Sequence, residues 1–268
     1  MLFQRLIWCA LAVAVLLGSA QTVLQRLQTV PLILAAEVFE EGKAEAAPAP
    51  ALAETHTHAD GAAAHEHGGA EEWSPAEGFE RTAWTWVANV LHAFSMALLA
   101  LAAMGFWTWR RGGATGRFKL AFAVAASGWL GLHFWPSLGL HAEVPGMEAA
   151  ALQARQAWWV LAVVCSLSAC AALAFGKHVW KFAVAALLLA VPFVVGAPQH
   201  SGDALAGFTG AAHEQMAELG RQFIWATTWL SISFWVLMGV LNAWVFSRWL
   251  KPVLTGAVAA EDTGALPA

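Results

Sequence analysis

The amino-acid sequence predicts an all-α, polytopic integral membrane protein: a helical bundle with six transmembrane helices and both termini in the cytoplasm. The 268-residue chain is 59% hydrophobic and 12% charged, whereas a typical soluble domain is about 25% charged. Its apolar residues form stretches long enough to cross a bilayer, and its basic residues gather at alternate ends of those stretches. This composition excludes a soluble enzyme, and no enzymatic activity is expected.

Six apolar stretches reach or approach the roughly 20 residues that a helix needs to cross the hydrocarbon core. Each must be helical, because lipid offers no hydrogen-bonding partner to the edge of a strand. The fifth is the shortest, and Pro192 near its end predicts a kink or an early exit. The stretches are 6–24, 83–109, 118–138, 157–175, 179–196 and 223–249.

Charge predicts the orientation, because Lys and Arg concentrate in cytoplasmic connections. Of the 18 acidic residues, 16 lie in the longer outer loops, and the other two are Glu261 and Asp262 in the C-terminal tail. The short inner segments carry basic residues instead. These are Arg5, Arg110, Arg111, Arg117, Lys119, Lys177, Lys181, Arg248 and Lys251.

The first stretch has a second interpretation. Residues 1–5, an apolar core and the small residues 18–20 resemble a cleaved signal peptide, which would leave five spans. Apolar character resumes at 30–34, which favours a retained span. The expected organisation is a first transmembrane helix at 1–24, an extracytoplasmic, His- and Glu-rich, largely disordered loop at 25–81, a five-helix core at 82–250 and a short cytoplasmic tail at 251–268.

Two His-x-His pairs lie in the low-complexity middle of the first outer loop, His56 with His58 and His65 with His67. In an extended chain, residues two apart point the same way, so each pair can offer two imidazoles to one ion. Neutral imidazole suits cobalt, nickel, copper and zinc. The pattern predicts weak metal capture, and a solvated linker with clustered histidines is the alternative.

The second outer loop holds two further metal candidates, His141 and Glu143. A lone histidine beside a carboxylate is more often a surface residue than a ligand. Seven of the ten histidines nevertheless fall on the predicted outer face, which makes that face the expected side of metal capture.

Inside the spans, the ionisable side chains are His92, near the middle of the second, and His133, in the third. Polar groups at that depth usually face the bundle interior. Asn89, His92 and Met96 follow the i, i+3, i+7 pattern of one helix stripe, which could line a transition-metal path. A histidine that donates one hydrogen bond to a neighbouring helix, with Met96 as a gap filler, explains the same residues equally well.

The block Glu-Val-Pro-Gly-Met at 143–147 is followed by Arg-Gln-Ala-Trp-Trp at 155–159. This pair of strings resembles the most specific motif of the CbtA family of predicted cobalt transporter subunits. Segments 30–34 and 196–198, and Trp235 with Gly239, extend the resemblance over nearly the whole chain. The sequence departs from the family's pattern at Phe39, His141-Ala142 and Phe193.

This resemblance implies a multi-pass subunit of the bacterial inner membrane that takes up cobalt for cobalamin synthesis. Cobalt(II) is the expected transported ion, with nickel(II) or zinc(II) as alternatives. The implied partners are membrane lipid and a small single-span subunit of the CbtB type, and no nucleic acid is expected. Two other functions stay open: a scaffold subunit without transport activity, and an electron carrier that binds haem through His92 and His133.

Overall fold

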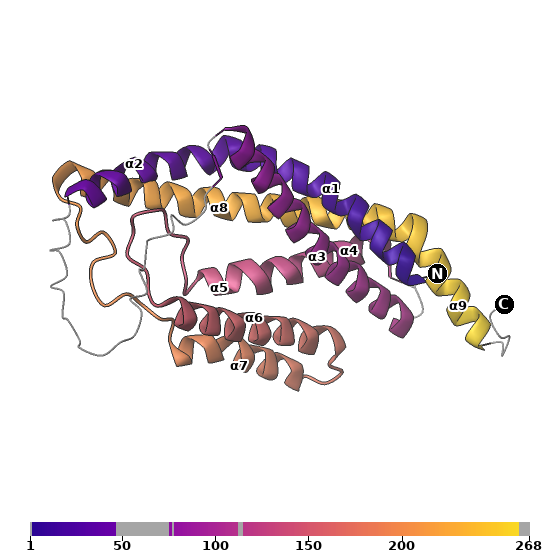
Figure 1. Ribbon diagram of the computed structural model, residues 1–268. Coiled ribbons are helices and arrows are strands. Elements are labelled where there is room, and N and C mark those ends of the chain that lie inside the picture. The colour runs from indigo at the N-terminus through magenta and orange to yellow at the C-terminus, as the bar shows by residue number, and fades with distance from the viewer. Residues whose placement is uncertain (1, 47–74, 77, 112–114, 263–268) are drawn as a thin grey trace, which may run out of the picture.

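The computed structural model describes residues 2–46, 75–76, 78–111 and 115–262. Within these residues the chain is helical and contains no strand, which confirms the predicted all-α class. Figure 1 shows an elongated bundle in which the start of α1 and the helix α9 lie at one end, and α2 with the first turns of α8 at the other. His56, His58, His65 and His67 lie outside the described residues.

The first two helices, α1 (Leu2–Gln28) and α2 (Val30–Ala46), form one nearly continuous rod. The Thr29 N–H donates to the carbonyl of Gln25, and the Ile33 N–H donates to the carbonyl of Thr29, so the backbone ladder continues across the break. Pro31 follows the break and has no N–H to donate. Part of the segment predicted as a loop at 25–81 is therefore helical, because α2 packs against α8 and the outer loops.

The third helix, α3 (Phe79–Arg111), lies against α1 along its length. Small residues face each other in this contact, and Ala14 and Ala97 are both 0% exposed. At Gly18 an added Cβ would lie 2.7 Å from the Cα of Val90, so only glycine allows this approach. Small residues permit such close packing in membranes, where apolar side chains gain little by leaving lipid.

A π-helical turn interrupts the next rod, which comprises α4 (Arg117–Trp129), η1 (Leu130–Phe134) and α5 (Trp135–Ser137). The Trp135 N–H donates to the carbonyl of Leu130 instead of Gly131. Pro136 has no N–H that could serve Gly131 in its place. Ser166 from a neighbouring helix lies 3.2 Å from the carbonyl oxygen of Gly131 and can donate its hydroxyl to it.

The last rod repeats this arrangement. It comprises α8 (Gly210–Val245), η2 (Phe246–Leu250) and α9 (Lys251–Asp262). The Lys251 N–H donates to the carbonyl of Phe246, and Pro252 stands two residues after the π turn, as Pro136 does in the earlier rod.

In the chain between these two rods, α6 (Leu152–Phe175) and α7 (Trp180–Val195) form a hairpin that packs against η1 and α5 on one side of the bundle (Figure 1). The Trp158 indole donates to the carbonyl of Pro192 over 2.9 Å, and joins the two helices. The helix α7 continues through Pro192 and ends at Gly196, whose φ of 87° suits a helix terminus.

Four helical segments in the described chain are long and apolar enough to cross a membrane: Leu2–Gln28, Phe79–Arg111, Leu152–Phe175 and Gly210–Gly256. The helix Trp180–Val195 is apolar but shorter. The predicted third span is helical from Arg117 to Ser137, with the π turn inside it. By length and composition, the described helices account for four of the six predicted spans.

Two apolar clusters divide the bundle. The larger one joins α1, α3, α4 and α8 through the length of the rods. The smaller one joins α2 to the loops before α6 and α8, and contains Ala36, Val144, Leu205, Phe208 and Met216. We call α2, the loops 138–151 and 196–209 and the first turns of α8 the outer cap, a name that follows the predicted orientation.

The opposite end of the bundle, here called the basic end, gathers cationic side chains. The Arg5 guanidinium donates to the carbonyl of Trp249 over 3.5 Å, and the Arg111 guanidinium donates to that of Ala174 over 3.5 Å. The Lys181 ammonium donates to the carbonyl of Leu173. Cations at carbonyls near helix C-termini are favoured by the helix dipole.

Candidate functional site

One cavity gathers both membrane histidines. Its volume is about 620 Å³, and its walls come from α1, α2, α3, η1 and α8, with Trp159 from α6. His92, His133, Asn89 and Met96 all line it, so the structure brings the predicted stripe and the second histidine together. The other polar lining residues are Gln21, Gln25, Thr29, Arg81, Thr85, Thr227 and Ser231. We call this space the polar cavity.

A network of side-chain amides holds one wall of the polar cavity. Asn89 on α3 donates to the Oε1 of Gln25 over 2.8 Å and to the hydroxyl of Thr22 over 3.0 Å. Gln25 donates back to the Oδ1 of Asn89 over 3.2 Å. One turn inward, Gln21 donates to the hydroxyl of Ser233 on α8 over 3.1 Å. Interhelical bonds of this kind satisfy polar groups that lipid cannot, and they fix α1 between α3 and α8.

The two imidazoles are left available. In the part of the chain that the structure describes, neither His92 nor His133 has a hydrogen-bond partner on the protein. The ring of His92 lies 5.2 Å from that of Phe234, measured between centroids. This arrangement disagrees with the interpretation of His92 as a residue that bonds a neighbouring helix. It leaves the ring nitrogens free for a ligand or for water.

No closed metal centre is built from the described residues, because no group of three or more His, Cys, Asp or Glu side chains is close enough to hold an ion. Two imidazoles and the Met96 thioether around a roomy cavity suit a hydrated or partly hydrated ion. Conduction requires sites that bind well enough to admit an ion and weakly enough to release it.

One ion pair borders the polar cavity, and another lies in the outer cap. Arg81, which lines the cavity, bonds the carboxylate of Glu37 on α2. Glu143, a predicted metal candidate, lies 2.9 Å from the guanidinium of Arg155. This pair joins the two halves of the block 143–159 and engages the carboxylate in the structure. His141 lies exposed on the same loop.

The block 143–147 fits closely onto α2. Gly146 has a φ of 83°, and an added Cβ would lie 3.2 Å from the ring of Phe208 and 3.3 Å from the Cβ of Glu40. Lys43 donates to Glu148 over 2.8 Å, and this hydrogen bond and charge hold the pKa of Glu148 below its usual value. The packing of this block on α2 was not predicted from the sequence, because residues 30–46 were expected to belong to a loop.

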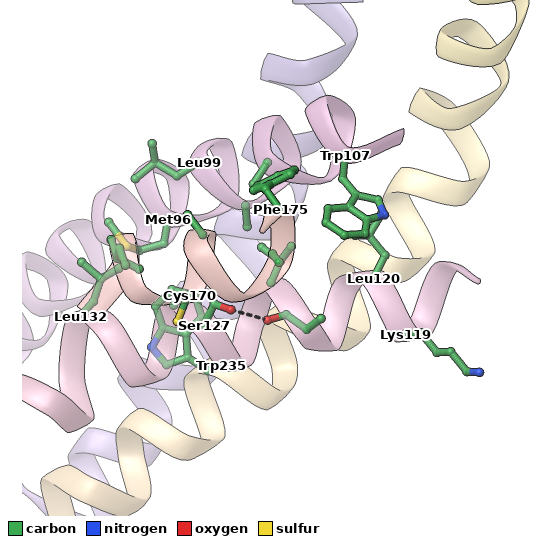
Figure 2. A pocket seen from close by; sticks show the side chains of 18 of the residues that line it. Met96, Leu99, Trp107, Lys119, Leu120, Ser127, Leu132, Cys170, Phe175 and Trp235 are labelled. Carbon is green, nitrogen blue, oxygen red and sulfur yellow. Dashed lines mark hydrogen bonds between the residues drawn. The ribbon is translucent and has the colours of Figure 1, made fainter. Parts of the chain in front are cut away.

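A second cavity lies between α3, α4 and α6, and its volume is about 430 Å³ (Figure 2). Its lining is almost wholly apolar, and includes Leu99, Leu120 and Phe175. The Ser127 hydroxyl on its wall donates to the carbonyl of Ala123 in its own helix. We call this space the apolar cavity. It shares Met96, Leu132 and Trp235 with the polar cavity, so these three residues form a wall between them.

The comparisons with curated proteins and with solved structures gave no match. The model of the CbtA family, described as a probable cobalt transporter subunit, matches residues 3–247. This range contains both cavities, the block 143–159 and the rods from α1 to the end of α8. The description names cobalt, not nickel or zinc, and a transporter subunit is not a class of enzyme. The chain has several helices that are apolar enough to cross a membrane. It belongs to the CbtA family of probable cobalt transporter subunits.

Proposed function

We propose that this chain takes up cobalt(II) and that the polar cavity is the outer half of the ion's route. The observation that carries the proposal is the pair of imidazoles, His92 and His133, which line one cavity without protein hydrogen bonds. The Met96 thioether adds a soft ligand. Imidazole and thioether favour transition metals over magnesium and calcium, which prefer oxygen.

The orientation proposed has six passes, with the outer cap outside the bacterial inner membrane and the basic end in the cytoplasm. The positive-inside rule supports this, because Arg5, Arg111 and Lys181 meet helix ends at the basic end. The alternating direction of the rods in Figure 1 agrees with it. In this arrangement the segment Arg117 to Ser137 is the third pass and α7 the fifth.

The outer loop between α2 and α3 is proposed to gather the ion. Its candidate ligands are His56, His58, His65 and His67, with His141 on the neighbouring loop as a weaker candidate. The loop's two flanks are held at the outer cap by Lys43 with Glu148 and by Arg81 with Glu37. Ions captured there would be released beside the polar cavity, which Arg81 lines.

The driving force is proposed to be the membrane potential or a partner. An ion of charge 2+ that enters a negative cytoplasm gains about 4.6 kcal/mol per 100 mV. The family description calls its members subunits, which implies a partner. A small single-span protein of the CbtB type is the partner we propose.

The test is accumulation of cobalt-57 and nickel-63 in cells with and without the chain. We expect the chain to raise cobalt accumulation, and His92→Ala with His133→Ala to reduce that rise by about tenfold, as a loss of about 1.4 kcal/mol would. His178→Ala, an exposed histidine near the basic end, is the control. Wild-type accumulation in the double variant would refute the proposed route.

Reconstitution decides between a transporter and a scaffold. Cobalt uptake by the purified chain alone in liposomes is expected if the chain itself conducts the ion. Uptake that needs a second subunit and is unchanged when His92 and His133 are replaced would reduce the chain to an accessory role. A haem protein would show a Soret band, so a colourless purified protein would remove the electron-carrier alternative.

A further inference from the structure

A single side-chain atom stands out in the inner half of the bundle. Asn242 on α8 is 2% exposed, and its Oδ1 is the one buried side-chain nitrogen or oxygen in the described residues that has no hydrogen-bond partner. Leaving such a group unpaired destabilises the folded protein. A buried acceptor that the protein itself does not satisfy therefore points to water or a ligand.

The position of Asn242 lies in line with the polar cavity. The residues that line the cavity on each helix extend inward as far as Gln21, Met96, Leu132 and Trp235. Trp235 and Asn242 are seven residues apart on one helix, which corresponds to about 10 Å at 1.5 Å per residue. Trp249, at the basic end, lies another seven residues on. Asn242 is thus midway between the floor of the cavity and the basic end.

The helix places a second candidate ligand beside it. Met238 precedes Asn242 by four residues, so the two share a face one turn apart. Met238 is 0% exposed and lies in the larger apolar cluster, between α8 and its neighbours. An amide and a thioether thus occur together here, as Asn89 and Met96 do on the α3 stripe.

Two aromatic rings lie between the polar cavity and the pair Met238 and Asn242. Phe234 contacts His92 on the cavity side and lies 5.4 Å from the ring of Trp235, measured between centroids. Both aromatic residues are nearly buried, at 6% and 8% exposed. A route that continues inward from the polar cavity along α8 would pass this pair and then reach Met238 and Asn242.

We propose that Asn242 and Met238 form an inner binding station for the transported ion, beyond the Phe234–Trp235 pair. The inference rests on the proposed function, and deepens it by adding a second site to the route. The amide oxygen would replace one water of the ion's hydration shell, and the thioether would favour a transition metal over magnesium or calcium.

The test is equilibrium binding of cobalt-57 to the purified full-length protein in a background without the outer candidate ligands. In this background His56, His58, His65, His67, His92, His133 and His141 are all replaced by alanine. We expect it to retain cobalt binding that Asn242→Leu weakens about tenfold. Asn242→Asp should keep the binding, because the carboxylate retains the oxygen ligand but loses the amide donor. Met238→Leu should weaken it less.

Met216→Leu is the matched control, because Met216 is 0% exposed and lies in the smaller apolar cluster, away from Asn242. Thermal unfolding in detergent checks that each variant is folded. Unchanged binding in Asn242→Leu, or equal loss in Met216→Leu and Asn242→Leu, would overturn the inference. Failure of the proposed function would show separately, as cobalt uptake in cells that does not depend on the chain.

Discussion

The polar and apolar cavities are neighbours, with volumes of about 620 and 430 Å³, and they differ in which polar groups their walls leave without a partner. The polar cavity has imidazoles without protein hydrogen bonds and amides held by α1, whereas the two hydroxyls of the apolar cavity, on Ser127 and Thr115, are both hydrogen-bonded. The Lys119 side chain points away from the apolar cavity (Figure 2). The unpaired polar groups identify the first as a place for an ion, and the apolar lining makes the second a place for lipid or an apolar side chain.

The shared wall provides the sharpest test of this difference. Trp235→Ala should join the two cavities and lower the free energy of unfolding by about 3 kcal/mol, because a large buried side chain is lost. Cobalt uptake should fall with it. Trp229→Ala, an exposed tryptophan two turns earlier on α8, is the control and should cost far less. Equal stability of both variants would show that no wall exists.

Filling each cavity in turn compares them directly. Thr227→Leu places a larger apolar side chain in the polar cavity and should reduce cobalt uptake about tenfold. The Thr227 hydroxyl bonds only carbonyls of its own helix, so no interhelical bond is lost. Ala171→Leu fills the apolar cavity in the same way and should leave the uptake rate near wild type. Equal effects on uptake would contradict the assignment of the ion to one cavity.

Removing the amide network should have a smaller effect. Asn89→Leu deletes the bonds to Gln25 and Thr22, and interhelical bonds in membranes average about 0.6 kcal/mol each. We expect a loss of about 1 kcal/mol in unfolding free energy, measured by chemical denaturation in detergent micelles. Ser127→Leu in the apolar cavity removes no interhelical bond and serves as the comparison. A larger loss in Ser127→Leu would reverse the expected order.

The smallest expected effect is a pH dependence of stability at the ion pair of Lys43 and Glu148 in the outer cap. The Lys43 bond lowers the pKa of Glu148 in the folded protein, so the stability it contributes is present above the unfolded pKa and is lost as the pH falls through the folded one. The melting temperature of Lys43→Met should therefore lie below wild type at neutral pH and approach it in acid. A gap that widens in acid would contradict this sign.

The sequence predicted those parts of the fold and site that one helix specifies by itself. Asn89, His92 and Met96 share a face because of the helical period. The depth of His133 in its apolar stretch predicted that its side chain faces the bundle interior. Gln21 and Gln25 were missed, although their i, i+4 spacing near the end of an apolar stretch was a usable signal. The outer cap could not be foreseen, because α2 is stabilised by distant loops. The pairing of Glu143 with Arg155 likewise needs the fold that brings both ends of the block together.

The two π turns have a mechanical consequence for the bundle. Each π turn lacks one backbone hydrogen bond of a regular α-helix, and the following proline has no N–H to replace it, so the rod bends more easily there than within a regular α-helix. One π turn holds His133 on the wall of the polar cavity, and the other lies beside Arg5 at the opposite end. Between the two π turns, α1 and α3 form a tight contact, here called the seam, at Gly18 and Val90, where the helices cannot move closer together. The rods that start at Arg117 and Gly210 can therefore tilt at opposite ends while the seam between α1 and α3 stays rigid.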